Sequence, residues 1–518
     1  MKFFSKVFLV GAPAAIAASM AGVTGGCSTE FSARECKVDG DCGSNMVCAS
    51  AGQDGNKTGA SSACVLPEQA PLTIGISAVG NGPAQDLGIG MRDGIKLAFD
   101  YQNDHGAVRG RKLILKFEDD GYDPATAEQK ARELLDVQTV AETPRCQSTT
   151  KNPQTAALYP EGTNPVSTTR LDRGSNAVLA IIGNVGTPTM ARFAPIALET
   201  QTLFFGAFTG AKLLLRDETA GPACKKFIFN VRASYAQEAR ATLEYFVRHH
   251  NIKDYKHLIS FDQFDSYGQA GFQGLIDAYG ALQAIPSEGL TPLPNAEALF
   301  RSRYQRDSVN SAKDEATKVI NYIKGVVDAD SNDHTFGILM TDTYPVGEAF
   351  IKAIRDSVLG SAPYDKRAAI VFSNVSFVGP NSLAKRLSAL GPKYTKNVLV
   401  SQVVPNYAED QVSLVQTYND LTKGDPTKRN FTSFEGYIAG RVFIAGLLQH
   451  KGAFTSESLI NTFEGLSAGE EIGLGTSSGF SPSDHNYSKS VWGTLINDDG
   501  SFRNAYFWRE GTAITIYI

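Results

Sequence analysis

The stretch AIIGNVGTPTMARFAP, residues 180–195, decides the fold class of this chain. It begins as an apolar run, turns at glycine and continues in a pattern typical of a helix. Thr187 suits the N-cap of that helix, and Pro188 suits its first turn, where the missing N–H of proline costs nothing. We therefore expect a buried strand that passes directly into a helix, which is the repeating unit of α/β proteins.

Alternating strands and helices continue from Leu72 onward. Most candidate strands are nearly continuous apolar runs, as parallel strands covered on both faces are. The ten predicted strands are 72–77, 112–119, 178–184, 202–207, 226–231, 256–262, 335–342, 368–375, 397–404 and 490–497. Helices are expected between them, among them 124–136, which starts with proline, and 234–250, which has a Ser-x-x-Gln capping box. Ten strands are more than one open sheet in a chain of this length usually contains, and we therefore predict two doubly wound α/β lobes.

Composition argues against a nucleic-acid binder, and the catalytic motifs that could be recognised in the sequence are missing. The chain has 518 residues, 42% of them hydrophobic, which is enough for two or three domains. Its net charge of −5 is unlike that of a nucleic-acid binder. The seven histidines have no HExxH spacing, and no Gly-x-Ser-x-Gly elbow occurs. The glycine-rich stretches 88–94 and 473–479 both miss the dinucleotide spacing. We expect neither a cofactor nor a metal.

The first 27 residues are expected to be a targeting segment. Lys2 and Lys6 precede an apolar stretch, 7–18, that is too short to span a bilayer. VTGGC, residues 23–27, resembles the lipobox of bacterial lipoproteins, which implies that Cys27 carries a lipid and becomes the new N-terminus. An ordinary cleaved secretion signal is the alternative.

Four of the remaining six cysteines fall in a segment that differs from everything downstream, residues 28–71. Such a polar stretch cannot build an apolar core, so two disulfides among these cysteines are expected to hold it as a small module on a tether. A zinc site is the rival, although the five-residue gaps differ from the close CxxC spacing of zinc knuckles. The cysteines concerned are Cys36, Cys42, Cys48 and Cys64.

A long polar loop is predicted for residues 138–176, which contain four prolines and show no periodicity. Cys146 lies in this insertion, and Cys224 comes just before the predicted strand 226–231. Pairing these two cysteines would pin the insertion to its lobe.

Six stretches, in order along the chain, resemble the leucine/isoleucine/valine-binding type of solute receptor that serves ABC importers, the type 1 periplasmic binding proteins. They are 74–124, IIGNVGTPTM (181–190), FNVRASYAQE (229–238), FDQFDSYGQAG (261–271), VSFVGPNSLAKRL (375–387) and FEGYIAGRVFIAGLL (434–448). The resemblance implies two lobes joined by three crossovers, with the ligand between them. Lobe one would be 72–232 plus 406–482, and lobe two 233–405 plus 483–518.

The resemblance also implies a set of ligand contacts in lobe one. Thr187 aligns with a hydroxyl donor to the ligand's carboxylate, although the residues alone leave helix cap and ligand seat equally open. Thr209, with the carbonyl of Ala207 or Phe208, aligns with a second contact at the end of the next strand. Leu87 stands where the family has an aromatic contact, which suggests a roomier pocket.

Lobe two would supply aromatic cover from Tyr267 and Tyr344, and Tyr235 would line the mouth of the cleft. The chain departs from the family at 374–376, Asn-Val-Ser, where members that bind amino acids have a glutamate for the ligand's ammonium. Ser376 would be the contact there. Because a buried ammonium needs an anionic partner, either the ligand has no ammonium or another carboxylate replaces that glutamate. The candidate carboxylates are Asp262, Asp265 and Asp342.

The function implied is capture of an amino acid or a related carboxylate or amide, and its delivery to ABC permease subunits. The protein would lie outside the cytoplasm, in the periplasm or cell envelope, anchored by lipid and with no nucleic-acid partner. Two alternatives stay open. One is a ligand sensor that signals through a membrane partner, and the other is a surface protein whose cysteine module contacts other molecules.

Overall fold

A computed structural model of the chain describes residues 35–37, 39–43, 46–49, 61–146, 169–212, 224, 226–466, 472–474 and 478–517. The predicted targeting segment and Cys27 lie outside these residues. Among the described residues, no helix is both long and apolar enough to cross a membrane.

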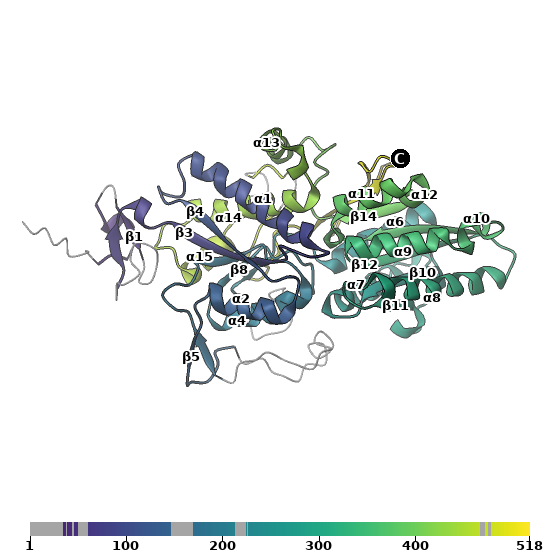
Figure 1. Ribbon diagram of the computed structural model, residues 1–518, viewed down its shortest axis with the longest axis horizontal. Helices are drawn as coiled ribbons and strands as arrows, with labels where there is room; N and C mark the ends of the chain where they lie inside the picture. Colours follow the sequence, from purple (N-terminus) through teal and green to yellow (C-terminus); the bar gives the residue numbers. More distant parts are fainter. Residues whose placement is uncertain are drawn as a thin grey trace, which may run out of the picture.

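Lobe one is built on a five-stranded parallel sheet of order β4-β3-β7-β8-β9. Its strands are β3 (Leu72–Ala78), β4 (Leu113–Asp119), β7 (Ala180–Ile182), β8 (Leu203–Phe205) and β9 (Ile228–Phe229). Its helices are α1 (Gln85–Asp104), α2 (Pro124–Leu134), α4 (Thr187–Glu199), α13 (Ser413–Leu421), α14 (Phe431–Gln449) and α15 (Ser456–Glu464). The pair α1 and α14 packs on one face of the sheet, and the pair α2 and α4 packs on the other (Figure 1).

Lobe two is built on a mixed sheet of order β11-β10-β12-β13-β14-β15-β16-β17. The run from β11 to β14 is parallel, and the remaining strands are antiparallel. Its strands are β10 (Leu258–Gln263), β11 (Phe300–Tyr304), β12 (His334–Thr341), β13 (Ala368–Asn374), β14 (Val398–Gln402), β15 (Ser490–Ile496), β16 (Phe502–Arg509) and β17 (Thr515–Ile516).

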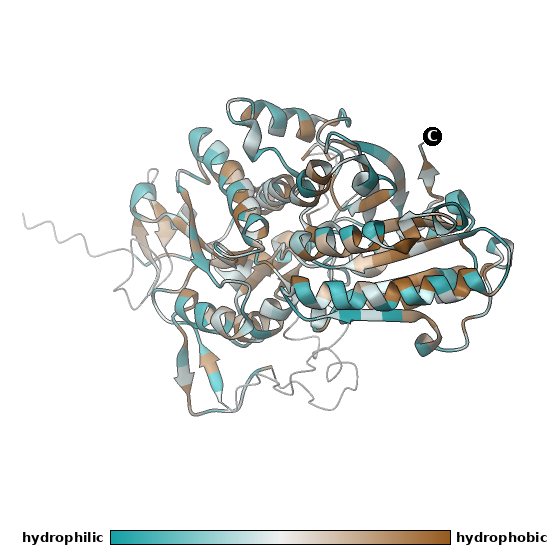
Figure 2. Ribbon diagram, turned by 45° about the vertical axis from the view of Figure 1, so that its right-hand side comes forward, coloured by the Kyte–Doolittle hydropathy of each residue, from teal (hydrophilic) through white to brown (hydrophobic). Residues whose placement is uncertain are grey.

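The helices of lobe two cover both faces of its sheet. They are α6 (Tyr235–His250), α7 (Ser266–Gln283), α8 (Val309–Asp328), α9 (Tyr344–Asp356), α10 (Tyr364–Arg367), α11 (Pro380–Leu390) and α12 (Pro392–Thr395). Buried Ala312, Ala316, Val319 and Ile323 give α8 an apolar stripe at helical spacing. Figure 2 shows the same pattern generally, with hydrophobic strands inside each lobe and hydrophilic residues on the outer sides of the helices.

Over the described residues the chain passes between the two lobes three times, between β9 and α6, between β14 and α13, and between α15 and β15. The first and third passages lie side by side, because Asn230 N donates to the carbonyl of His485 and Tyr487 N donates to that of Asn230, each over 2.8 Å. The two-lobed α/β fold is therefore confirmed, and each of the ten predicted strands overlaps an observed one. The residue limits predicted for the lobes stay a prediction.

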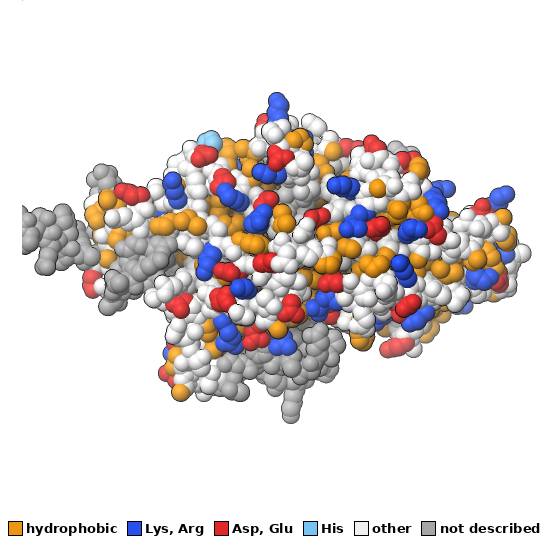
Figure 3. Space-filling model, viewed as in Figure 1, with side chains coloured by type: hydrophobic (Ala, Val, Ile, Leu, Met, Phe, Trp, Pro, Cys, Tyr) orange, Lys and Arg blue, Asp and Glu red, His pale blue; other side chains and the backbone are white. Residues whose placement is uncertain are grey.

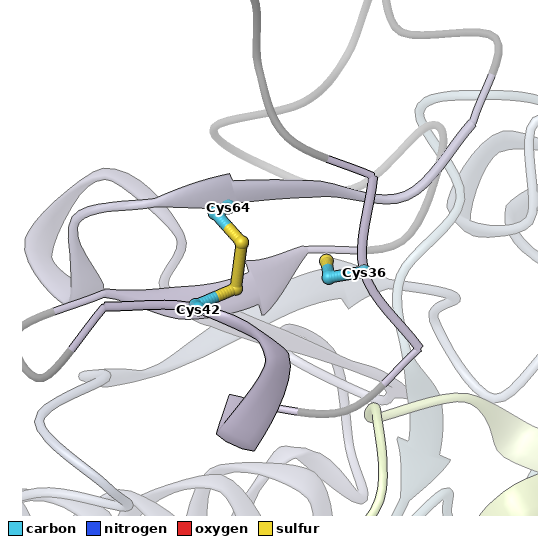
Figure 4. A group of neighbouring side chains, drawn as sticks. All are labelled: Cys36, Cys42 and Cys64. Atoms are coloured by element: carbon cyan, nitrogen blue, oxygen red, sulfur yellow. A yellow bond between two sulfur atoms is a disulfide. The ribbon is translucent and has the colours of Figure 1, made fainter.

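The four cysteines of the N-terminal module form two disulfides, Cys36–Cys48 and Cys42–Cys64. They hold a short antiparallel pair, β1 (Val47–Ala49) with β2 (Ala63–Val65). The sulfurs of Cys36, Cys42 and Cys64 lie within 4.8 Å of one another, and Figure 4 shows the Cys42–Cys64 bond beside Cys36. Because the sulfurs are bonded to each other, the disulfide interpretation holds over the zinc one.

The predicted insertion differs from a structureless loop at its base, where β5 (Gln138–Val140) pairs with β6 (Arg170–Asp172). The sequence of this segment has no periodicity, so it did not indicate the short β5–β6 pairing. Residues 147–168 of the insertion are not among the residues that the structure describes. The disulfide Cys146–Cys224 is present, as predicted. Glu199, at the end of α4, accepts hydrogen bonds from Arg145 N and Cys146 N, each 2.8 Å long. The insertion is thus fixed to lobe one.

We predict that replacing Cys146 and Cys224 together by serine lowers the free energy of unfolding by about 3–4 kcal/mol, because the bond closes a loop of 78 residues in the unfolded chain. Chemical denaturation followed by circular dichroism measures it. The control replaces Cys36 and Cys48 by serine. It should leave the denaturation midpoint of the two lobes unchanged, because the Cys36–Cys48 bond lies in the small N-terminal module. Equal midpoints for the two variants would contradict the prediction.

Candidate functional site

Two threonines meet at the carboxyl end of the lobe-one sheet. Thr187 follows β7 and Thr209 follows β8, and because neighbouring parallel strands end at the same edge, their hydroxyl oxygens lie 2.7 Å apart. Both residues are buried. The sequence-based pairing of these two strand ends is therefore correct in position, whereas a ligand contact by them stays a prediction.

The N-cap of α4 is Gly186 rather than Thr187, which is a correction. Gly186 has a φ of 100°, a left-handed conformation that favours glycine, and a β-carbon there would collide with the ring of Tyr122. The chain therefore makes its sharp turn one residue earlier, and Thr187 and Pro188 both fall inside the first helical turn. The hydroxyl of Thr187 is consequently not used to cap the helix.

The backbone around the second strand end is already hydrogen-bonded. The carbonyl of Phe208 accepts from Gly186 N over 3.3 Å, and that of Ala207 accepts from Thr209 N over 2.9 Å. A carbonyl oxygen has two lone pairs, so each can accept one further bond. Tyr235 adjoins this turn, because its amide donates to the carbonyl of Gly210 over 2.8 Å.

Aromatic rings fill the contact between the lobes beside the threonines. Phe377, from the short helix η8 (Ser376–Val378) of lobe two, packs against Phe208 of lobe one, with ring centroids 5.0 Å apart. The same ring lies 4.7 Å from that of Tyr267 and 6.2 Å from that of Tyr122. The ring of Tyr235 lies 5.6 Å from that of Tyr267. The structure thus brings Tyr235, Tyr267 and Phe208 together, and all are buried, whereas their contact with a ligand stays a prediction.

Sequence reasoning missed Phe377 and Tyr122. Both lie inside stretches that carried the resemblance, but nothing in their spacing marks them as facing the other lobe. Tyr122 also receives a 3.5 Å hydrogen bond from the side-chain amide of Gln263 in lobe two.

Tyr344 and Leu87 form a separate contact between the lobes, on either side of Gly379. A β-carbon at Gly379 would lie 2.8 Å from the ring of Tyr344 and 2.9 Å from the side chain of Leu87. Beside it, the hydroxyl of Ser382 donates to Asp86 over 2.6 Å. Burial and the neighbouring Asp86 raise the pKa of Tyr344 to about 12. These residues join α1 of lobe one to α11 of lobe two.

Ser376 belongs to a buried ion-pair cluster around Arg232. The guanidinium of Arg232 lies 2.8 Å from Glu238 of α6 and 3.3 Å from Glu435 of α14, so it contacts both lobes. Ser376 N donates to Glu238 over 2.7 Å, and its hydroxyl bonds to Arg232 and Glu238. We call Arg232, Glu238, Glu435 and Ser376 the hinge cluster. Sequence reasoning did not assign the three charged members.

The three carboxylates considered for a ligand ammonium differ sharply in environment. Asp262 binds Arg301 through both oxygens, over 2.7 and 2.8 Å, and also pairs with Arg303. Asp265 pairs with Arg306 over 3.0 Å and accepts from Tyr267 N at the start of α7. Asp342 is fully buried, and its Oδ2 has no hydrogen-bond partner. Two of the three acids are therefore already neutralised.

We predict that the hinge cluster gives the free energy of unfolding a pH dependence through Glu435. Burial raises the pKa of Glu435 from 4.5 to about 7, with Arg232 opposing and Glu238 reinforcing the shift. The folded chain then holds this proton more tightly than the unfolded chain, so stability falls as the pH rises from about 4.5 to about 7. Glu435→Gln should remove that loss, about 3 kcal/mol, and so be the more stable form at pH 8.

Denaturation at pH 5 and pH 8 measures the effect of Glu435→Gln. Its control is Glu457→Gln, on α15, an exposed acid paired with Lys226. Identical pH profiles for wild type and Glu435→Gln would count against the assignment.

Charges of both signs are mixed over the face of the molecule in Figure 3, with no large patch of one sign. Solved structures of binding proteins share the two-lobed fold. The family model "Periplasmic binding protein" matches residues 71–145. A comparison with curated protein sequences finds no match.

Solved structures match over most of the chain. A possible leucine/isoleucine/valine-binding protein from Rhodopirellula baltica is 29% identical, with a TM-score of 0.63, covering 85% of this chain and 97% of its own. A branched-chain amino acid ABC transporter protein from Thermus thermophilus with bound valine is 13% identical (TM-score 0.60, covering 87% and 97%). A fatty acid ABC transporter substrate-binding protein from Thermomonospora curvata is 15% identical (TM-score 0.61, covering 85% and 93%). The chain therefore has the fold of the type 1 periplasmic binding proteins and is similar to them in sequence at residues 71–145.

Proposed function

We propose that this protein is an extracytoplasmic receptor that captures a small acidic solute between its lobes and delivers it to an ABC importer. The observation that carries the proposal is the buried pair Thr187 and Thr209, at the end of lobe one that faces lobe two. The anchor would be a lipid on Cys27, and the partners would be the importer's permease subunits. Catalysis has no part in this role.

The start of α4 supports an acidic ligand. The first N–H groups of a helix have no partner within it, and the helix dipole places partial positive charge there. Thr187 and Thr189 contribute such amides directly beside the threonine hydroxyls. A carboxylate in this position would receive charge-assisted hydrogen bonds of roughly 1.5–3 kcal/mol each. A few of these are enough for micromolar binding, which needs about 8 kcal/mol.

Closure of the hinge would complete the site. The ligand docks on lobe one, and lobe two then brings Tyr267 and Phe377 against it. Contacts such as Phe377–Phe208 and Gln263–Tyr122 exist only when the lobes are together, so they favour the closed form. The closed shape is what the permease would recognise.

The similar solved structures restrict the chemical class of the ligand only broadly. The protein from Thermus thermophilus holds valine, and that from Thermomonospora curvata is named for fatty acids, so carboxylates of quite different size occur on this fold. Release of small molecules from gently purified protein, followed by mass spectrometry, tests the proposal. Recovery of a defined acid supports it. Recovery of none, together with no shift in melting temperature across a panel of small acids, rejects it.

We predict that replacing Thr187 and Thr209 together by alanine weakens binding of that acid about tenfold or more without unfolding the protein, because two hydroxyl donors are lost. Isothermal titration calorimetry measures the affinity, and circular dichroism confirms the fold.

The matched control lies at the other end of α4, where the hydroxyls of Thr200 and Thr202 are also buried and 3.0 Å apart. Alanine at both should leave the affinity unchanged. Equal affinity in the two double variants would refute the site assignment.

A further inference from the structure

A cavity of about 870 Å³ lies beside the passages of the chain between the lobes. Its walls come from α6, from α7, from residues 484–486 of the third passage and from residues 510–513, which follow β16. Pockets that hold small molecules usually measure about 300–1,000 Å³. Thr187, Thr209 and Phe377 do not line this cavity, which we call the hinge cavity, so it is separate from the candidate site between the lobes.

The charged side chains that line the hinge cavity neutralise one another. Lys212 pairs with Asp277 over 2.8 Å, and Lys489 pairs with Asp484 over 2.6 Å. The remaining lysines, arginines and acids of the lining are ion-paired as well. An ionic solute would have to displace one of these partners, whereas a neutral solute would not. The charge distribution therefore favours a neutral ligand.

Two polar side-chain atoms of the lining are buried without a hydrogen-bond partner in the described part of the chain. They are Nε1 of Trp508, on β16, and Oδ1 of Asn486, in the third passage. Each residue is more than nine-tenths buried. The indole N–H only donates, and the amide oxygen only accepts. Because buried polar atoms rarely stay unpaired, this complementary pair points to a missing partner that can both accept and donate, as a hydroxyl group does.

The width of the hinge cavity depends on the angle between the lobes. Its lining includes Lys212 of lobe one and Asp277 of α7 in lobe two, which pair across it. Asn486 lies in the third passage and bridges Asn230 in the first, so both passages lie at the cavity. A rotation of the lobes about these passages therefore widens or narrows the cavity. A widened form would give a solute access to the two atoms, which are shielded from solvent in this state.

One wall of the hinge cavity is apolar. It consists of Ala278, Ala281 and Ile285, at the end of α7. We propose that the hinge cavity binds a neutral solute rich in hydroxyl groups, of the size of a sugar or a nucleoside. Its hydroxyl groups would pair with Trp508 and Asn486, and its C–H groups would lie on the α7 wall. This inference does not depend on the ligand of the candidate site between the lobes.

The test follows the indole N–H signals in the nuclear magnetic resonance spectrum of the full chain. The chain has two tryptophans, so there are two such signals, and Trp508→Phe identifies the one from Trp508. The probes are the sugars glucose, sucrose and trehalose and the nucleosides uridine and adenosine. We expect at least one probe to shift the Trp508 signal saturably and to leave that of Trp492 in place. Which group of probes binds distinguishes a sugar from a nucleoside.

Charged counterparts of the probes test the neutral character of the ligand. They are gluconate and glucosamine for the sugars and uridine monophosphate for the nucleosides. Because a charged group would have to enter a site whose ions are already paired, each should bind about tenfold more weakly than its neutral counterpart, or less tightly still. Trp508→Phe should weaken binding of the neutral probe about fivefold, through loss of one hydrogen bond, as measured by calorimetry.

A second pair of variants tests the location without touching a buried residue. Ala281 is exposed and lines the cavity, so Ala281→Phe should fill part of the space and weaken the neutral probe about tenfold or more. Ala284, just past the end of α7, is exposed as well but does not line the cavity, so Ala284→Phe is the matched control and should bind as wild type does. Equal melting temperatures of the two variants show that the fold is intact.

Four results would each overturn the inference. They are the absence of any probe that shifts the Trp508 signal, equal affinity of Ala281→Phe and Ala284→Phe, equal affinity for charged and neutral counterparts, and loss of probe binding in the double variant of Thr187 and Thr209. The last result would place the probe between the lobes instead of in the hinge cavity.

Discussion

The buried charge of Arg232 is the constraint on which the arrangement of the two lobes depends. A guanidinium cannot lose its charge, so in a dry interior it must be surrounded by acceptors. Arg232 finds them in Glu238 of lobe two and Glu435 of lobe one. Burial raises the pKa of Glu435, and the second acid, Glu238, adds to the rise while Arg232 opposes it. Holding the lobes together and satisfying this side chain are the same condition.

The hinge cluster also determines what the cleft contains. Ser376 is fixed by Glu238 and Arg232, and the next residue, Phe377, is thereby held between Phe208 and Tyr267. Any opening that separates Ser376 from Arg232 must also withdraw this ring from lobe one. Of the three acids considered for a ligand ammonium, Asp342 alone forms no ion pair within the described part of the chain.

Much of the fold was predictable because its strands are buried on both faces and read as apolar runs. β11, with the sequence FRSRY, was not, because Arg301 and Arg303 alternate along an edge strand and find their partner, Asp262, on β10. A strand whose charges are neutralised by its neighbour looks like a loop in isolation. β5 and β6 were missed for a related reason, since they pair only with each other at the base of a polar insertion. The disulfide Cys146–Cys224 could be suggested from where the two cysteines fall, but cysteine positions alone do not determine a pairing.

The candidate site divides along the same line. Thr187 and Thr209 could be paired from sequence because parallel strands end at one edge, so strand order alone brings them together. The N-cap could not be placed correctly, because the choice of Gly186 depends on the ring of Tyr122 lying against it. Nor could Arg232 and Glu435 be paired, since their contact depends on where α14 returns to lobe one. Local sequence patterns therefore predict the part of the candidate site that lies at the edge of the lobe-one sheet. The part formed by contacts between the two lobes depends on how the lobes pack, which the sequence pattern does not show.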